Sequence, residues 1–146
     1  MTLNSKGFTL IETLIVFSVF CLMSSASFLL VGPAREVLAK QMFFSQLQSD
    51  LLFAQQYALS RQEHVNVIFA AEMNAYFIRT RSSRSMLIER RYSDDIGISE
   101  GSMKLSFEYG ADGNINKFGS LFVRAAGERY KLTFHIGRGR LTVARE

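Results

Sequence analysis

The sequence predicts an α+β fold in which one long N-terminal helix packs on a C-terminal antiparallel β-sheet. An apolar stretch without a charged side chain occupies residues 13–34. Apolar residues at helical spacing continue as far as Arg61, and short alternating segments replace them from Glu63 onward. The length of 146 residues suits one globular domain in addition to such a helix.

The apolar stretch is long enough to cross a membrane. At about 1.5 Å of rise per residue, a helix over residues 13–34 spans a hydrocarbon core of about 30 Å. Only Lys6 and the chain terminus carry positive charge before it. Because positive charge favours the cytoplasmic side, we expect a single-pass protein with a cytoplasmic N-terminus and an extracytoplasmic head.

Three interpretations of this N-terminal segment compete. The first is a secretory signal peptide cleaved in the small residues 24–27, the second is an uncleaved signal anchor, and the third is a prepilin leader. Glu12 distinguishes them, because a carboxylate near the start of an apolar helix is costly unless it has a partner. Neither a signal peptide nor a plain anchor requires such a residue, so Glu12 favours the prepilin leader.

Residues 6–12, which read KGFTLIE, match the class III signal of type IV pilins and pseudopilins, and the chain resembles that family. The resemblance implies that a prepilin peptidase cleaves between Gly7 and Phe8 and then N-methylates Phe8. It also implies that Glu12 compensates the N-terminal amine of a neighbouring subunit during filament assembly. Glycine suits the cleavage position physically, because it places no side chain beside the scissile bond.

This resemblance predicts the organisation of the chain. Residues 1–7 form a cleaved leader, residues 8–34 the transmembrane and assembly half of the helix, and residues 35–146 the extracytoplasmic head. Within the head we expect an amphipathic helix over residues 35–61 and a β-sheet over residues 64–145. Gly32 and Pro33 predict either a bend in the long helix or a break where the chain leaves the membrane.

The amphipathic helix presents an apolar stripe that we expect to pack on the sheet. Its members are Val37, Phe44, Leu47, Leu51, Ala54 and Ala58. Phe43, Leu52 and Leu59 widen the stripe, toward either the core or neighbouring subunits.

Seven strands are predicted after the helix from alternating or β-rich segments. They cover residues 65–70, 75–79, 86–91, 104–109, 120–124, 130–136 and 141–144. Turn residues separate them at positions 72–74, 112–114, 126–128 and 137–139.

The sequence contains no arrangement typical of catalysis. His64 and His135 are far apart and belong to no recognisable motif, and neither a calcium loop nor a phosphate-binding glycine loop is present. The single cysteine, Cys21, excludes an intrachain disulfide. We therefore expect no enzyme activity, no cofactor and no metal.

The net charge of +4 permits contact with polyanions without requiring it. A candidate polyanion-binding cluster consists of Arg79, Arg81, Arg84, Arg90 and Arg91. Glu89, Asp94 and Asp95 interrupt this cluster, and alternate strand residues face opposite ways. A solvated surface is the simpler interpretation, so we expect DNA to be contacted only weakly or indirectly.

The whole-chain pattern resembles the competence pseudopilins of Gram-positive bacteria, in particular the D-subunit type of the ComG set. The resemblance rests on the leader, the compact size and the runs at residues 55–61 and 137–143, while the helix over residues 49–61 is similar to that of H-type minor pseudopilins. It implies a minor pseudopilin of the transformation machinery, needed for DNA uptake and exposed at the cell surface after assembly with other pilins or pseudopilins. A minor pseudopilin of a type II-like secretion system and a signal-anchored adhesin are the alternatives.

Overall fold

The computed structural model describes residues 9–135 and 140–146, without the side chains of residues 26–34. The chain divides into two units, Met1–Arg35 and Glu36–Glu146, and the helix α1 (Leu10–Arg61) contributes to both. The first unit contains the beginning of α1, and the second unit contains the rest of α1 and all the described strands.

The helix α1 continues through Gly32 and Pro33 for 52 residues in total. The predicted break at this position is therefore wrong. A proline inside a helix removes one hydrogen bond and costs about 3 kcal/mol, but leucine, alanine, arginine and glutamate on either side of it are strong helix formers. The helix ends after Arg61, where Gln62 adopts a left-handed φ of 50° and the amide of Glu63 bonds the carbonyl of Ala58 at 3.1 Å. This is the bond of a Schellman motif.

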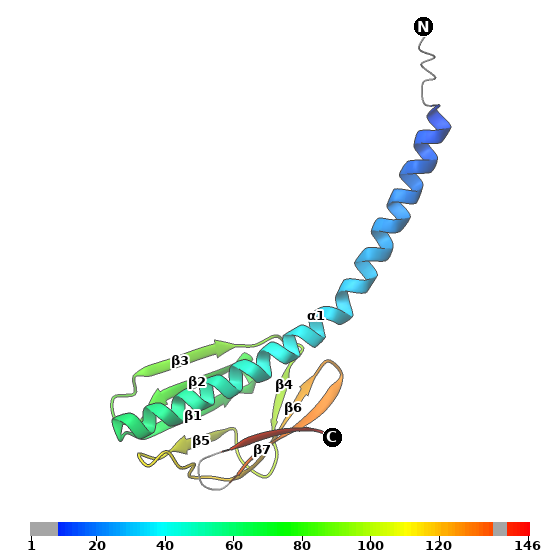
Figure 1. Ribbon diagram of the computed structural model, residues 1–146. Coiled ribbons are helices and arrows are strands. Elements are labelled where there is room, and N and C mark those ends of the chain that lie inside the picture. Colours follow the sequence, from blue (N-terminus) through cyan, green and yellow to red (C-terminus); the bar gives the residue numbers. More distant parts are fainter. Residues whose placement is uncertain (1–8, 136–139) are drawn as a thin grey trace. The chain divides into compact units, whose positions relative to one another are not determined.

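The described strands of the second unit form two four-stranded antiparallel sheets, which Figure 1 shows. The first sheet has the order β3-β2-β1-β5, and the second has the order β4-β6-β7-β8. Their bounds are β1 Val65–Ala70, β2 Ala75–Thr80, β3 Met86–Arg91, β4 Gly97–Glu100, β5 Ser106–Tyr109, β6 Gly119–Ala125, β7 Glu128–Phe134 and β8 Leu141–Arg145.

Local chemistry explains the tight turns. Asn74 adopts a left-handed conformation after the short helix η1 (Ala71–Met73), which joins β1 to β2. Ala126 and Gly127, with φ of 52° and 72°, form a two-residue turn between β6 and β7, as expected of a hairpin whose twist requires positive φ. The turn predicted at residues 137–139 lies outside the described residues.

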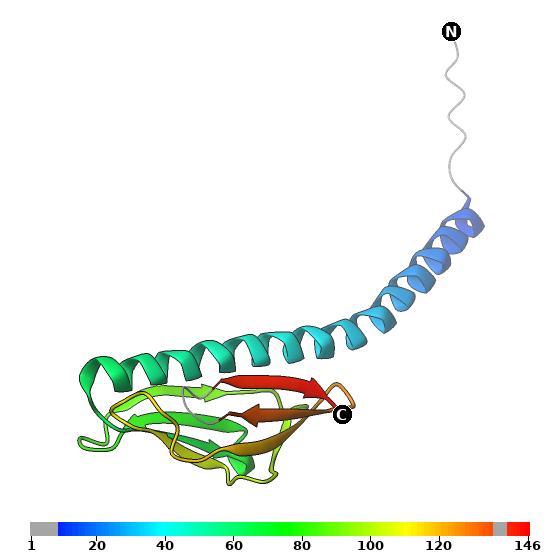
Figure 2. The same ribbon diagram turned by 60° about the horizontal axis from the view of Figure 1, so that its bottom comes forward.

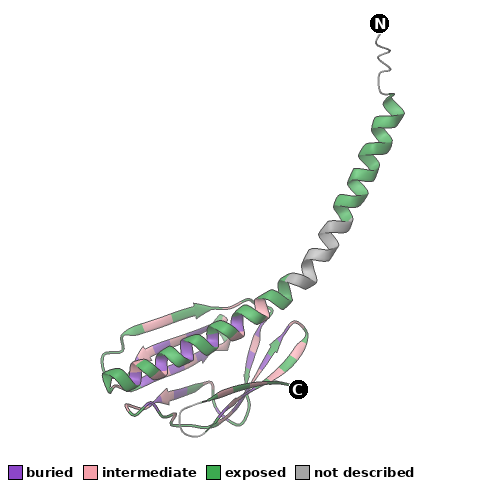
Figure 3. Cartoon of the chain, in the orientation of Figure 1, coloured by how far each residue is buried: buried purple, intermediate pink, exposed green. Residues whose placement is uncertain are grey.

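The core of the second unit lies between α1 and the sheets. Figures 1 and 2 show the later part of α1 lying over the first sheet, and Figure 3 shows buried segments, in purple, on this part of α1 and on strands of the second unit. The two sheets meet at Phe107 of β5 and Phe134 of β7, whose ring centroids are 4.9 Å apart. The helix contributes the buried side chains of Phe43, Leu47, Leu51, Ala54 and Ala58.

The prediction of a long helix packed on antiparallel strands is confirmed, with differences in detail. Val37, a predicted member of the apolar stripe, is 45% exposed, because the helix begins to contact the strands only near Lys40. Phe43, which lies on the same side as Leu47, occupies the core instead. Leu52 and Leu59 remain exposed on the outer side of α1.

Candidate functional site

Glu12 lies in the first turn of α1, and its side chain caps the N-terminus of the helix. Its Oε2 accepts a hydrogen bond from the amide of Thr9 at 3.5 Å, while the carbonyl of Thr9 accepts the amides of Glu12 and Thr13 at 3.1 and 3.2 Å. The residues T-x-x-E therefore form one arm of a capping box. Sequence reasoning missed this second role of Glu12, although the T-x-x-E spacing is readable. Gly7 and Phe8, the predicted cleavage site, lie outside the described residues.

Beyond Glu12, the described side chains at the beginning of α1 are exposed and largely apolar. Leu14, Ile15, Val16 and Phe17 occupy more than one full turn and are 58–65% exposed, so no side of the helix is polar there. Soluble monomers rarely expose an apolar surface of this extent. Among the residues whose side chains the structure describes, 9–25, 35–135 and 140–146, no helix meets the length and mean hydropathy expected of a membrane-crossing segment.

In the second unit, a buried polar network fastens α1 to the first sheet. Asp50 is only 7% exposed, and its Oδ2 accepts hydrogen bonds from the hydroxyl of Tyr76 at 2.7 Å and from Nε of Arg90 at 3.1 Å. Burial, and then the hydrogen bond to Asp50, raise the pKa of Tyr76 far above its ordinary value of 10.0. The hydroxyl therefore stays protonated and donates to Asp50.

A second network fastens the helix to the second sheet. Lys40 donates to Glu128 at 3.1 Å and to the hydroxyl of Tyr130 at 2.8 Å, and Phe44 packs edge-on against the Tyr130 ring. Arg145 bonds the other oxygen of Glu128 at 2.9 Å. The hydrogen bonds from Tyr130 and Lys40 lower the pKa of Glu128. Both sheets thus hold the later part of α1 in one position.

The Asp50 network predicts a measurable stability effect. Asp50→Ala leaves the buried Tyr76 hydroxyl without its acceptor, at a cost of about 1–3 kcal/mol, whereas Tyr76→Phe removes one neutral donor and costs about 1 kcal/mol. Thermal melting of the full chain in a mild non-ionic detergent measures both. Glu72→Ala, at an exposed position, is the matched control. Equal melting temperatures for Asp50→Ala and the control contradict this interpretation.

The structure does not gather the five arginines of the predicted basic cluster on one surface. Tyr76 pairs with Arg90 across β2 and β3, so Arg90 faces α1, whereas Arg79 lies on the opposite face of β2. Arg81 bonds Glu108 at 3.1 Å and Arg90 bonds Asp50. The remaining members, Arg84 and Arg91, are exposed.

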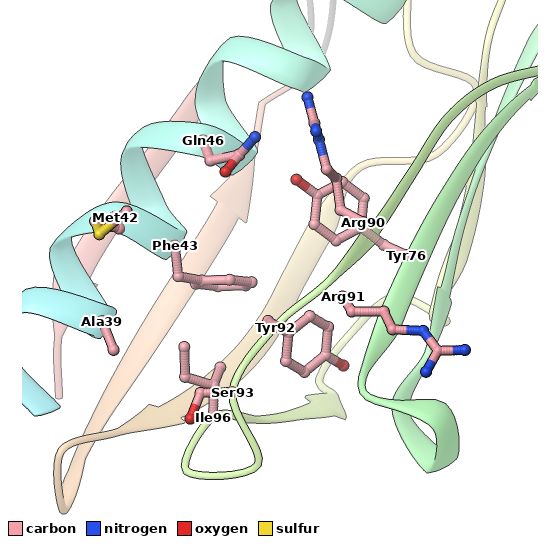
Figure 4. Close-up of a pocket in the computed structure, with 10 residues that line it drawn as sticks. All are labelled: Ala39, Met42, Phe43, Gln46, Tyr76, Arg90, Arg91, Tyr92, Ser93 and Ile96. Carbon is pink, nitrogen blue, oxygen red and sulfur yellow. The ribbon is translucent and has the colours of Figure 1, made fainter.

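A cleft of about 250 Å³ separates α1 from β3 beside this network. Figure 4 shows the side chain of Arg90 rising toward Gln46 of α1, whereas that of Arg91 points away. Among the described residues that line the cleft, Tyr92 has a buried hydroxyl without a hydrogen-bond partner. Arg90 and Arg91 both line the cleft, but their side chains point in different directions and do not form one binding surface.

The fold, with a long N-terminal helix packed on antiparallel sheets, is that of type IV pilin-like subunits. It is similar to the type IV minor pilin FimU of Pseudomonas aeruginosa, with a TM-score of 0.58 and 15% identity over 71% of this chain and 87% of that one. It is also similar to the minor pseudopilin EpsH of the Vibrio cholerae type 2 secretion system, with a TM-score of 0.56 and 10% identity over 72% of this chain and 95% of that one.

Sequence comparison is more specific than the fold. Residues 2–28 match the family model of the prokaryotic N-terminal methylation motif. The competence protein ComGD of Bacillus subtilis is 31% identical over 143 residues, which cover 98% of this chain and 96% of the relative. The chain therefore belongs to the ComGD family, and it is a minor pseudopilin of the competence type.

Proposed function

We propose that the chain is a structural subunit of a pilus-like machine that takes DNA up across the cell envelope during transformation. The observation that carries the proposal is the full-length similarity to a competence protein, combined with a pilin-like fold. Its partners in this role are other pilins or pseudopilins of the same filament. The role is one of assembly, as the similarity of the fold to a minor pilin and a minor pseudopilin supports.

The proposal includes maturation at the N-terminus. A prepilin peptidase cleaves between Gly7 and Phe8 and methylates Phe8, as the KGFTLIE string and the matching methylation motif support. The apolar residues that follow the cut stay in the mature chain and hold it in the cell membrane as a single pass until assembly. The head is then extracytoplasmic and reaches the cell surface in the filament.

Glu12 is the assembly charge in this proposal. Its carboxylate lies among exposed apolar side chains, and it requires a positive partner once these side chains are covered. The methylated amine of Phe8 in a neighbouring subunit has the required charge. Only a neighbour at the correct stagger satisfies both groups, so the pair selects the register of the filament.

Deletion of the gene tests the proposed function. We expect natural transformation to fall to the background of spontaneous mutation and to return when the intact gene is supplied. Secretion of soluble proteins should remain unchanged, because this subunit serves the DNA-uptake machine. Normal transformation of the deletion strain, or a general loss of secreted proteins, refutes the proposed function.

A further inference from the structure

The outer face of the second sheet combines positive charge with an aromatic ring. Leu121, Val123 and Leu132 point into the core, so the alternate residues of β6 and β7 point away from it. We call this set the arginine face, and its members are Phe122, Arg124, Arg129 and Lys131. None of them belongs to the arginine cluster that the sequence predicts.

The strand register brings these four side chains together. Arg124 lies opposite Arg129, and Phe122 lies opposite Lys131. Arg129 is the diagonal neighbour of Phe122, and its Cζ lies 4.1 Å from the centroid of the Phe122 ring. The guanidinium therefore rests on the ring, while 58% of the Arg129 side chain remains exposed. Together they form a π-rich platform.

A groove of about 360 Å³ runs beside this platform. Gly97 of the edge strand β4 lies opposite Arg124, and a Cβ at this position would lie 3.8 Å from Nη2 of Arg124. This distance is an ordinary van der Waals contact, and at Gly97 no side chain covers the guanidinium from the edge strand. Phe122, Arg124 and Arg129 of the arginine face all line this groove, and Gly97 and Glu128 border it.

The charges favour an anionic ligand. Glu128 borders the groove, but Lys40 and Arg145 engage both of its oxygens. Glu146 bonds Arg129 at 3.3 Å, and this pair is exposed, so a competing anion displaces it at little cost. The positive charges of Arg124, Arg129 and Lys131, together with the one negative charge of Glu146, give the arginine face a net charge of +2.

We propose that the arginine face binds a single-stranded stretch of DNA, an inference that rests on the proposed function. Arg124, Arg129 and Lys131 contact phosphates, and the pair of Arg129 and Phe122 stacks against an unpaired base. Cations interleaved with an aromatic ring are the combination that proteins use for single strands, and only a single strand exposes the flat faces of its bases. Three cations make the contact weak and strongly dependent on salt.

Fluorescence anisotropy tests this site with the full chain in a non-ionic detergent and a fluorescein-labelled thymidine oligonucleotide. The triple variant Arg124→Ala, Arg129→Ala, Lys131→Ala should lower affinity at least about tenfold and reduce the salt slope of log K by about 2, near 0.7 for each lost phosphate contact. The control variant Arg79→Ala, Arg84→Ala, Arg91→Ala loses the same charge elsewhere and should bind within twofold of wild type. An equal loss in both variants shows non-specific attraction and overturns the proposal.

Phe122→Leu separates stacking from charge. It should lower affinity about fivefold or more while the salt slope stays unchanged, because base stacking contributes without releasing counterions. Duplex DNA and poly(glycerol phosphate), added as competitors, should displace the oligonucleotide less effectively than unlabelled single strands. Equal competition together with unchanged binding by Phe122→Leu identifies a general phosphodiester surface and contradicts a single-strand site.

Transformation separates this inference from the proposed function. The arginine-face triple variant should be present in the filament fraction at the wild-type level but transform poorly. If the gene deletion abolishes transformation while this variant transforms and binds DNA as wild type does, only the inference fails. If the deletion itself transforms normally, the proposed function fails.

Discussion

Replacement of Glu12 by alanine is expected to leave cleavage and membrane insertion intact but to exclude the subunit from the filament. Removing one partner of a buried ion pair costs about 3–5 kcal/mol, which lowers the assembly constant by a hundredfold or more. The filament fraction sheared from competent cells, probed with an antibody to the head, measures incorporation. Transformation should fall in parallel with incorporation.

The capping role of Glu12 provides a sharper control than alanine alone. Glutamine at the same position keeps the hydrogen bond to the amide of Thr9 but removes the charge. Glu12→Gln should therefore fail to assemble as Glu12→Ala does. If Glu12→Gln assembles normally while Glu12→Ala does not, helix capping rather than charge compensation explains the residue.

Replacement of Gly7 by leucine is expected to block maturation. A side chain at this position obstructs the scissile bond, so the precursor keeps its leader and its positive Lys6. The chain then begins with the unprocessed leader, and no methylated amine forms at Phe8. Glu12 of a neighbouring subunit therefore lacks its positive partner. Immunoblotting should show the longer precursor in the membrane and none in the filament, with transformation abolished.

The control for this variant is Thr2→Ala, in the same leader but away from the cleavage position. It should mature and transform as wild type does. A Gly7→Leu chain of mature length in the filament contradicts class III processing at this bond.

Local patterns predict the elements of this chain better than their contacts. Alternation predicts β1 and β3 with the bounds that the structure has. It misses β4, because Gly97–Glu100 is a short edge strand with one apolar residue, Ile98, and its pairing with β6 depends on a distant segment. The division of the strands into two sheets depends on similar long-range pairings, which the alternation of apolar and polar residues does not predict.

The polar contacts of the head illustrate the same limit. Asp50 lies on the apolar stripe between Leu47 and Leu51. A charge at such a position predicts a buried partner, but the sequence alone does not show which residue it is. That Tyr76 and Arg90 supply this partner follows only from the strand register. Arginines that are close in the sequence lie on both faces of the first sheet. The arginine face, in contrast, combines residues of two strands, β6 and β7, of the second sheet.

Mass spectrometry of the N-terminal peptide from the membrane-extracted chain tests the central claim most directly. We expect a peptide that begins at Phe8 and carries one methyl group on its amine, with residues 1–7 absent. A chain that begins near Ala26 or Ser27 instead identifies a secretory signal peptide. An intact N-terminus identifies an uncleaved anchor, and either result contradicts a pseudopilin that matures at Gly7.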